Sequence, residues 1–505
     1  MIRGSRIVIV LLLIAGALVA ASRWTRASAE PVSREALAAG FDGGIRNLAI
    51  EWDPADPRLE SERRQALFGF MYQTYRASAW IPQSLFDSNI VTHAVAGDVD
   101  TIVGRKVGLV LWRDNPRVRA FGMAPNAGTG EPLRWTVNCL VCHTAEIDGV
   151  AYFGAGTKMF DELWLGEALK RLTSEQWRAL VSTRSGDAAL AADANRILNS
   201  HHHDKIDSIT RARSTAFAAS HVELYMRTHR NEMPPVADVG RGDVKTPPLW
   251  HTVAKMPARR WYTDGSFHGP FPLMASSMEL EKDRSFDALI SDVIPTIKEE
   301  FGTVVQHLRP PRYPYSIDRA LAARGRELFY SQDIGCHRCH GTYNGGRVDW
   351  PGVHVDVGTD RARLDVVSPQ FVQAFAQSPL AAEGALVKSR GYAATPLTGV
   401  WANFPYLHNG SVPTLHHLLG PASERPTIFQ VTAATTLDRA RVGQPLVGDA
   451  GDVRAGEPEL LRRHGTDRDW FNTARPGCSN TGHDFWRQIQ TDDNRRALIE
   501  YLKTL

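Results

Sequence analysis

Two short stretches decide how this chain is organised: CLVCH at residues 139–143 and CHRCH at residues 336–340. Each has the pattern C-x-x-C-H, which is typical of the covalent attachment of a c-type haem. Two cysteines three positions apart can reach the two vinyl groups of one porphyrin, and the histidine that follows can ligate the iron. The sequence therefore predicts two covalently bound haem c groups, held by Cys139, Cys142 and His143 at a first site and by Cys336, Cys339 and His340 at a second.

A C-x-x-C pair also occurs in redox-active dithiols and in zinc sites. Neither alternative explains why a histidine directly follows both pairs, and a structural zinc site needs further ligands at short spacing. The chain has five cysteines, and the fifth, Cys478, is far from both motifs in the sequence. Haem attachment is therefore the favoured interpretation, and Cys478 is expected to be a buried, unreactive thiol.

The composition is that of a globular protein of two or three domains, with 505 residues of which 43% are hydrophobic. The formal net charge is +3, but residues 1–29 contain four arginines and no acidic residue, so the rest of the chain is close to neutral. We expect no nucleic-acid partner, because no basic patch is apparent.

The N-terminus has the pattern of an export signal. Arg3 and Arg6 precede an uncharged run over residues 7–21, and the small residues Ala27, Ser28 and Ala29 follow. Residues 1–29 are predicted to be a signal peptide, with an uncleaved N-terminal membrane anchor as the alternative. Both predict a periplasmic or secreted protein, anchored to the cytoplasmic membrane in the second case.

A proline-rich stretch at residues 309–314 divides the chain. After it, Ser316 is expected to cap a helix that leads into Cys336, with Gly325 as a point of close approach, and a second helix is expected after Thr491. A helix before the haem motif and another at the C-terminus are typical of a cytochrome c domain. We therefore predict a C-terminal cytochrome c domain over residues 316–505.

The first motif lies in a longer unit, predicted to be an N-terminal haem c domain over residues 41–309. Helical stretches are expected around residues 60–77, 162–181 and 188–198, and little strand periodicity is apparent. The predicted fold class is mainly α, with two cytochrome c-like haem domains and long irregular loops.

The stretch WANFPYLHNGSVPTL at residues 401–415 resembles a segment that di-haem cytochrome c peroxidases, and the related tryptophylquinone-forming enzyme, place after their second haem motif. The fuller pattern is most similar to the RoxA-like di-haem cytochromes, the group that contains the rubber oxygenases. Residues 138–143, 245–250 and 479–483 fit that group. The chain is shorter than expected for a rubber-cleaving member, so the resemblance supports the cofactor arrangement better than the substrate.

The resemblance implies that His143 and His340 are proximal ligands and that His483 is the sixth ligand of the second haem. It places Tyr406 close to the second haem and Trp250 close to the first. The first haem would be open on one side, where peroxide or dioxygen would bind. Five residues lie in a segment that could line the distal pocket of the first haem: His251, Trp261, Tyr262, Phe267 and His268.

Several of these residues also have ordinary structural explanations. Tyr406, Trp401 and Trp250 are candidates for catalytic or redox roles, but each is equally a large aromatic suited to a core. The run of histidines at 201–203 is expected to be a solvated turn rather than a metal site. Asp356 and Asp360 have oxygen atoms suited to calcium, and a polar loop with ordinary caps accounts for them as well.

The sequence thus predicts a periplasmic di-haem c-type cytochrome oxidoreductase with one electron-transfer haem and one reactive haem acting on peroxide or dioxygen. Its electron partner would be a redox protein or a quinol-linked donor, and an organic substrate stays open. The alternative is a non-enzymatic electron-transfer cytochrome in which both haems are six-coordinate.

Overall fold

The computed structural model describes residues 35, 41, 48–73, 81–82, 101–112, 120–125, 134–161, 211–215, 242–256, 261–269, 290–291, 294–344, 347–431, 435–446, 453–464 and 467–505. The predicted export segment, the predicted helices at 162–181 and 188–198, and the histidines at 201–203 lie outside these ranges. Within them, no helix has both the length and the apolar character needed to cross a membrane.

The described elements before the proline-rich stretch are short. Residues 48–161 form β1 (Leu48–Ala49), β2 (Glu51–Trp52), α3 (Glu60–Phe68), a π-helical turn η2 (Gly69–Gln73), β3 (Ile81–Pro82), a second π-helical turn η3 (Thr101–Lys106), β4 (Met123–Pro125), β5 (Arg134–Val137), a 3₁₀ turn η4 (Cys139–Val141), β6 (Thr144–Ile147) and β7 (Val150–Phe153). Residues 211–309 add β8 (Arg213–Thr215), β9 (Asp243–Lys245), α10 (His251–Lys255), β10 (Phe267–His268), α13 (Ile294–Thr303), η6 (Val305–His307) and β11 (Leu308–Arg309).

The elements after that stretch are more regular. Residues 310–431 form α14 (Arg319–Tyr330), α15 (His337–His340), β12 (Thr342–Asn344), β13 (Arg347–Asp349), β14 (His354–Val355), α16 (Ala362–Asp365), α17 (Pro369–Ala376), η7 (Pro379–Ala382), β15 (Ala385–Leu386), β16 (Tyr392–Ala393), η8 (Val400–Ala402), α18 (Leu415–Leu419), η9 (Ala422–Glu424) and β17 (Ile428–Gln430). The chain ends with α19 (Val453–His464), β18 (Trp470–Asn472), α20 (Trp486–Ile489) and α21 (Asp492–Leu502).

The prediction of a mainly α fold is wrong. Among the described residues, 37% are helical and 16% lie in strands. These strands form two three-stranded sheets, ordered β1-β7-β6 and β3-β5-β4, and six two-stranded sheets. The strands are two to four residues long, which is too short for a period of two to stand out in a sequence. The architecture is a mixture of helices and many small sheets joined by long loops.

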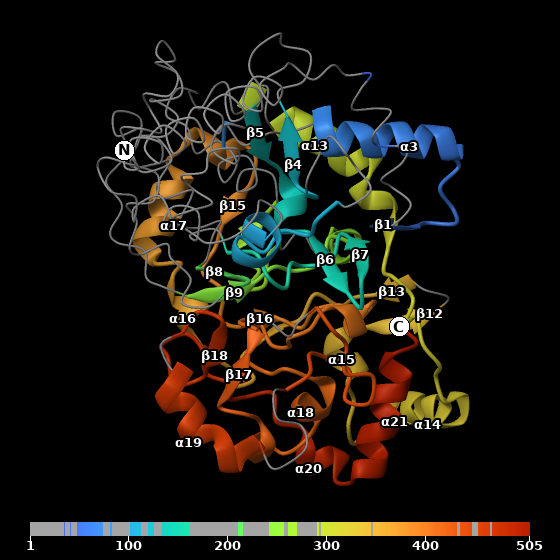
Figure 1. The fold of residues 1–505 in the computed structure, drawn as a ribbon, viewed down its shortest axis with the longest axis vertical. Helices are drawn as coiled ribbons and strands as arrows, with labels where there is room; N and C mark the ends of the chain where they lie inside the picture. Colours follow the sequence, from blue (N-terminus) through green and yellow to red (C-terminus); the bar gives the residue numbers. More distant parts are fainter. Residues whose placement is uncertain are drawn as a thin grey trace, which may run out of the picture.

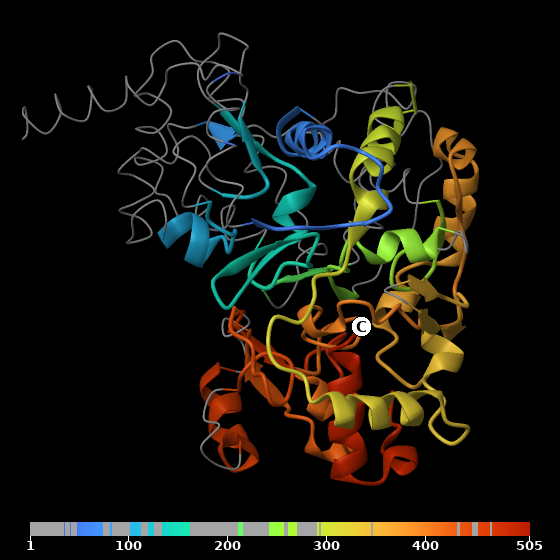
Figure 2. The ribbon, with the colours of Figure 1, turned by 90° about the vertical axis from the view of Figure 1, so that its right-hand side faces the viewer.

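Helices α14 and α21 pack closely against each other and cross in the lower part of the molecule (Figure 2). Their contact depends on Gly325, because a Cβ atom there would lie 1.9 Å from the carbonyl oxygen of Ala497. The prediction of Gly325 as a point of close approach is confirmed. The side chain of Thr491 caps α21, as predicted, but α14 is capped by Asp318 and not by Ser316. An aspartate just before the first helical turn accepts a backbone hydrogen bond as well as a serine does.

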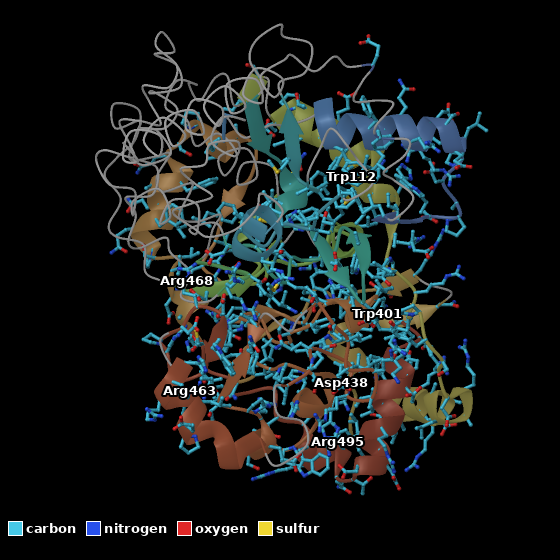
Figure 3. All side chains as sticks on the ribbon, viewed as in Figure 1. Trp112, Trp401, Asp438, Arg463, Arg468 and Arg495 are labelled. Carbon is cyan, nitrogen blue, oxygen red and sulfur yellow. The ribbon has the colours of Figure 1, made fainter. Side chains whose placement is uncertain are left out.

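The parts before and after residue 310 share one core. Figure 1 shows the early elements in the upper half and most later ones in the lower half, while α17 and β15 lie beside the early elements. Strand β10 pairs with β15, with Phe267 opposite Leu386, and the rings of Phe267 and Phe375 pack at 5.5 Å. Trp401 lies near the junction of the two halves (Figure 3). The two predicted haem units are therefore joined through a continuous apolar cluster.

Candidate haem sites

The second C-x-x-C-H motif forms one tight turn. Cys336 lies at the N-cap position of α15, and Gly341, with φ of 91°, ends this helix directly after His340. A positive φ is accessible to glycine at little cost, so the chain can turn away from the motif. Cys336 and Cys339 are not joined by a disulfide, and burial raises the pKa of the Cys336 thiol to about 12. Both sulfur atoms are thus available for attachment.

The orientation of His340 is fixed by the backbone. Its Nδ1 donates a hydrogen bond of 2.8 Å to the carbonyl of Thr395, and its own carbonyl accepts one of 2.7 Å from the hydroxyl of Tyr343. A hydrogen bond at Nδ1 leaves Nε2 as the ligating nitrogen. Burial lowers the pKa of His340, which favours the neutral imidazole that binds metals.

His483 faces His340 from the loop before α20. The centroids of the two rings are 6.1 Å apart, and their planes are inclined by 65°. The backbone N–H of His483 donates to the carbonyl of Val357 at 2.9 Å, and φ of His483 is 48°. Gly482 lies so close to the backbone of Gly358 that a Cβ atom would meet it at 2.3 Å. Close backbone packing therefore holds the loop that carries His483.

The side chain of Arg425 also holds this loop in place. Its Nη1 donates to the carbonyls of Asn480 and Gly482 at 2.6 and 2.7 Å, and its Nη2 donates to that of His483 at 3.2 Å. The side chain is 1% exposed. One guanidinium thus satisfies three carbonyls beside His483, a role that the sequence did not signal.

The second site fits a six-coordinate haem iron. Each metal–nitrogen bond to an imidazole is about 2.0 Å long, and the ring centroid lies one ring radius beyond the nitrogen. Two imidazoles on opposite sides of one iron therefore have ring centroids about 6 Å apart. The observed 6.1 Å meets that requirement. The Nδ1 of His483 is buried and has no hydrogen-bond partner among the described residues. Burial, followed by the positive charges of its neighbours, lowers the pKa of His483 to about 3, so its ring is neutral.

The first motif is anchored by Asn138. Its side-chain oxygen accepts from the N–H of Leu140 at 2.9 Å and its amide donates to the carbonyl of Met71 at 2.8 Å. The N–H of Thr157 donates to the carbonyl of Cys142 at 2.8 Å. Cys139 and Cys142 form no disulfide. These contacts hold both sulfur atoms on a 3₁₀ turn between β5 and β6.

His143 has a different environment from His340. Its Nδ1 is buried and has no hydrogen-bond partner of good geometry among the described residues. Burial lowers the pKa of His143 to about 4, although the Pro247 carbonyl has a smaller effect in the opposite direction. Among the described residues, no second histidine ring pairs with His143 as His483 pairs with His340. The neutral ring suits a proximal ligand, and the first site has one identified axial ligand.

The two sites are linked by the short stretch from Thr395 to Thr398. The carbonyl of Thr395 accepts from His340, and that of Thr398 accepts from the indole N–H of Trp250 at 3.0 Å and from Nε2 of His251 at 2.8 Å. Gly154, in the hairpin that follows His143, lies against the ring of Trp250. Trp250 therefore packs between elements of both sites. In the candidate lining segment, the described residues Trp261 and Phe267 are buried.

Trp401 and Tyr406 lie in the core between the sites. The indole N–H of Trp401 donates to the carbonyl of Pro311 at 2.8 Å, and the ring packs edge-on against Tyr152 and Tyr313. The hydroxyl of Tyr406 reaches the carbonyls of Val400 and Val442, at 3.3 and 3.2 Å. Both polar atoms are satisfied by backbone, and catalytic roles for Trp401, Tyr406 and Trp250 stay predictions.

Two lysines, Lys158, which is buried, and Lys245, which is half-buried, hold the backbone around Tyr406. Lys158 donates to the carbonyls of residues 402 and 404, and Lys245 donates to those of residues 403 and 405. The two side chains therefore donate hydrogen bonds to alternate carbonyls of one segment, residues 402–405. Neither has a carboxylate among these partners, and burial lowers the pKa of both amines well below the ordinary value. No spacing rule could have indicated this contact.

The predicted calcium residues are engaged elsewhere. Asp356 accepts from the N–H of Gly358 and pairs with Arg361 at 2.5 Å, while Asp360 accepts from the N–H groups of Ala362 and Ser479. The described residues contain no cluster of three or more acidic, histidine or cysteine side chains placed to hold a metal ion. Calcium stays a prediction without support from these contacts.

Residues 391–430 match a family model described as RoxA-like, cytochrome c-like. The chain is 33% identical over 238 residues to the uncharacterized protein y4iM of Sinorhizobium fredii, covering 39% of this chain and 51% of that protein. It is 28% identical over 300 residues to the uncharacterized protein y4iJ of the same organism, covering 46% and 47%. The chain thus spans about half the length of these curated relatives.

The matched segment contains the residues that join the two sites. Thr395, Thr398, Trp401 and Tyr406 all fall inside it, as does Arg425. The resemblance to the RoxA-like cytochromes c is confirmed for this segment. It supports a haem-binding redox cytochrome with covalently bound haem c.

Proposed function

We propose that this protein is a periplasmic di-haem c-type cytochrome oxidoreductase, in which one haem transfers electrons and the other reacts with peroxide or dioxygen. The observation that carries the proposal is the difference between the two sites. His340 has His483 at the distance that a shared iron needs, whereas His143 has no such partner among the described residues. Bound haem iron exchanges electrons when both axial positions are filled, and binds a small oxidant when one is open.

The chain's own residues would keep the two sites different. Thr395 and Arg425 fix the two histidines of the second site, so that its ligands cannot easily move away. Beside the first site, Trp250 is buried against Gly154 and excludes water from the neighbouring backbone. The stretch from Thr395 to Thr398 connects the hydrogen-bond partner of His340 with the carbonyl that accepts from Trp250 beside the other site.

The remaining parts of the proposal rest on the sequence. Residues 1–29 would export the chain, as a cleaved signal or as an anchor, and a redox protein or a quinol-linked donor would supply electrons. Trp250, Trp401 and Tyr406 would assist electron transfer between the sites, since they lie in or beside the core that joins them. The organic substrate, if one exists, stays open, and the proposal does not require calcium.

Peroxide turnover by single-haem variants tests the proposal. Holoprotein supplied with a reduced electron donor should consume peroxide or dioxygen, and Cys139→Ser with Cys142→Ser, which removes the first haem, should abolish turnover. The same change at Cys336 and Cys339 should leave the first site able to bind small ligands but unable to sustain turnover. A protein with both haems that consumes neither oxidant would instead be an electron-transfer cytochrome.

A further inference from the structure

Arg363 is a buried arginine with unused hydrogen-bonding capacity. It lies on α16, is 3% exposed, and has its Nη1 at 3.2 Å from a carboxylate oxygen of Asp264. Its Nε and Nη1 make no hydrogen bond of acceptable geometry within the described structure. A buried charged group whose donors have no acceptor loses its hydration without compensation, which destabilises the folded chain. Such donors indicate a place where an acceptor binds.

A second unpartnered polar atom belongs to the same cluster. The ring of His408 stacks on that of Tyr392 at 3.8 Å, and its buried Nε2 has no hydrogen-bond partner in the described ranges. Burial, followed by the nearby charges of Arg363 and Lys245, lowers the pKa of His408 to about 3. His408 is therefore neutral, and the tautomer with its proton on Nε2 can donate to an anion beside Arg363.

In the described part of this cluster, two cationic side chains, Lys255 and Arg363, share the carboxylate of Asp264. Lys255 is buried and close enough to Asp264 for that carboxylate to raise its pKa, although burial brings the pKa down to about 8. Asp264 is thus shared by Lys255 and Arg363, and its other oxygen accepts from the N–H and hydroxyl of Ser266. Buried charges are tolerated when they are paired. One further carboxylate would neutralise the two cations.

The cluster lies between the elements that carry the two haem sites. α16 follows the 357–359 segment, whose carbonyls bind His483 and Thr481. Tyr392 begins β16, which leads within three residues to Thr395, the partner of His340. Lys255 lies on α10, which begins directly after Trp250, and Trp250 packs on Gly154 beside the first motif. Short stretches of chain therefore connect Arg363 with the residues that fix His340 and His483, so a carboxylate that extends from a haem edge is the candidate acceptor.

We infer that Arg363, assisted by His408, binds a propionate of one of the two haems. A guanidinium matches a carboxylate in geometry and charge, and Nε with an Nη can form two parallel hydrogen bonds to it. Asp264 holds Arg363 in place and moderates its charge. The inference rests on the covalently bound haem of the proposed function and does not depend on either iron being open.

Spectroelectrochemical titration of the holoprotein tests the inference. Arg363→Gln should lower the midpoint potential of one haem, because a cation that favours the reduced state is lost; we expect about a tenfold shift of the one-electron equilibrium, about 59 mV. Arg363→Lys should restore most of the shift, and Asp264→Asn should move the same haem in the opposite direction. Arg496→Gln, an exposed arginine paired with Asp493, is the matched control. Resonance Raman bands of the propionates should change only in the Arg363 variants.

The outcomes separate this inference from its alternatives. Potentials of Arg363→Gln equal to those of Arg496→Gln would overturn it, as would shifts of the same sign in Arg363→Gln and Asp264→Asn. A potential that follows added acetate or chloride, with unchanged propionate bands, would identify a solution anion instead. If Arg363→Gln does not accumulate as holoprotein, a raised potential in Asp264→Asn together with changed propionate bands in Arg363→Lys would support the inference, and unchanged values of both would overturn it. Carbon monoxide binding to the same samples reports separately on the proposed function.

Discussion

The imidazole rings of His340 and His483 lie 6.1 Å apart although 143 positions separate them in the sequence. One ring is fixed through its Nδ1 to the Thr395 carbonyl, and the other by backbone contacts with Val357 and Arg425. Two independently held rings at this separation are what a bis-histidine iron requires. This pair distinguishes the second site from the first.

Replacing His483 with alanine should convert the second haem from a low-spin to a high-spin form, because one strong-field axial ligand is lost. EPR spectra of the oxidised protein measure this directly. His464→Ala is the control, since His464 lies at the end of α19, outside both haem motifs, and stacks on Trp470. A low-spin signal that persists in His483→Ala would show that another group ligates the iron.

Loss of one motif should remove one haem. Cys336→Ser together with Cys339→Ser should leave one covalently bound haem per chain, and the same holds for the pair Cys139 and Cys142. Cys478→Ala should keep two, because Cys478 is fully buried in a separate small apolar cluster. Mass spectrometry and haem absorbance count the groups, and two haems in either double variant would refute the assignment.

Gly325→Ala tests the contact between α14 and α21. The added methyl group would lie 1.9 Å from the Ala497 carbonyl, so we expect the free energy of unfolding to fall by about 1–3 kcal/mol despite the better helix propensity of alanine. Gly302→Ala in α13 meets only the flexible Gln306 side chain at 3.9 Å. That control should be neutral or stabilising by up to about 1 kcal/mol. Equal urea unfolding curves for both variants would contradict the close approach.

Lys158→Met and Lys245→Met test the lysine contacts with residues 402–405. Each removes donors from buried carbonyls, and we expect a loss of about 2–4 kcal/mol in the free energy of unfolding. The double variant should lose less than the sum, because both lysines hold one segment. Lys298→Met, which breaks an exposed pair with Glu383, should cost about 0–1 kcal/mol. Additive losses would show that the two lysines act independently.

The sequence was most informative where chemistry is local. The C-x-x-C-H motifs, the cap at Thr491 and the close approach at Gly325 depend on neighbouring residues or on one helix face. The fold class was predicted wrongly because strands of two to four residues are defined by pairing with distant segments, as β10 is with β15. Position within a related family, rather than spacing, pointed to His483.

Other parts of the site could not be predicted from the chain alone. Lys158 and Lys245 bind backbone carbonyls, which carry no signature in the sequence. Arg425 and Arg363 are two of many arginines, and only burial and their partners distinguish them. Such contacts arise when loops distant in the sequence are packed together, and they become visible only in three dimensions.

In the proposed arrangement, one iron has both axial positions filled and the other has one open. Titration of the dithionite-reduced protein with carbon monoxide, followed by optical spectroscopy, measures this difference. One carbon monoxide should bind per chain, at the haem attached to Cys139 and Cys142, and binding should be lost in the double serine variant of those cysteines. No binding at either haem would contradict this arrangement and identify an electron-transfer cytochrome with both irons six-coordinate.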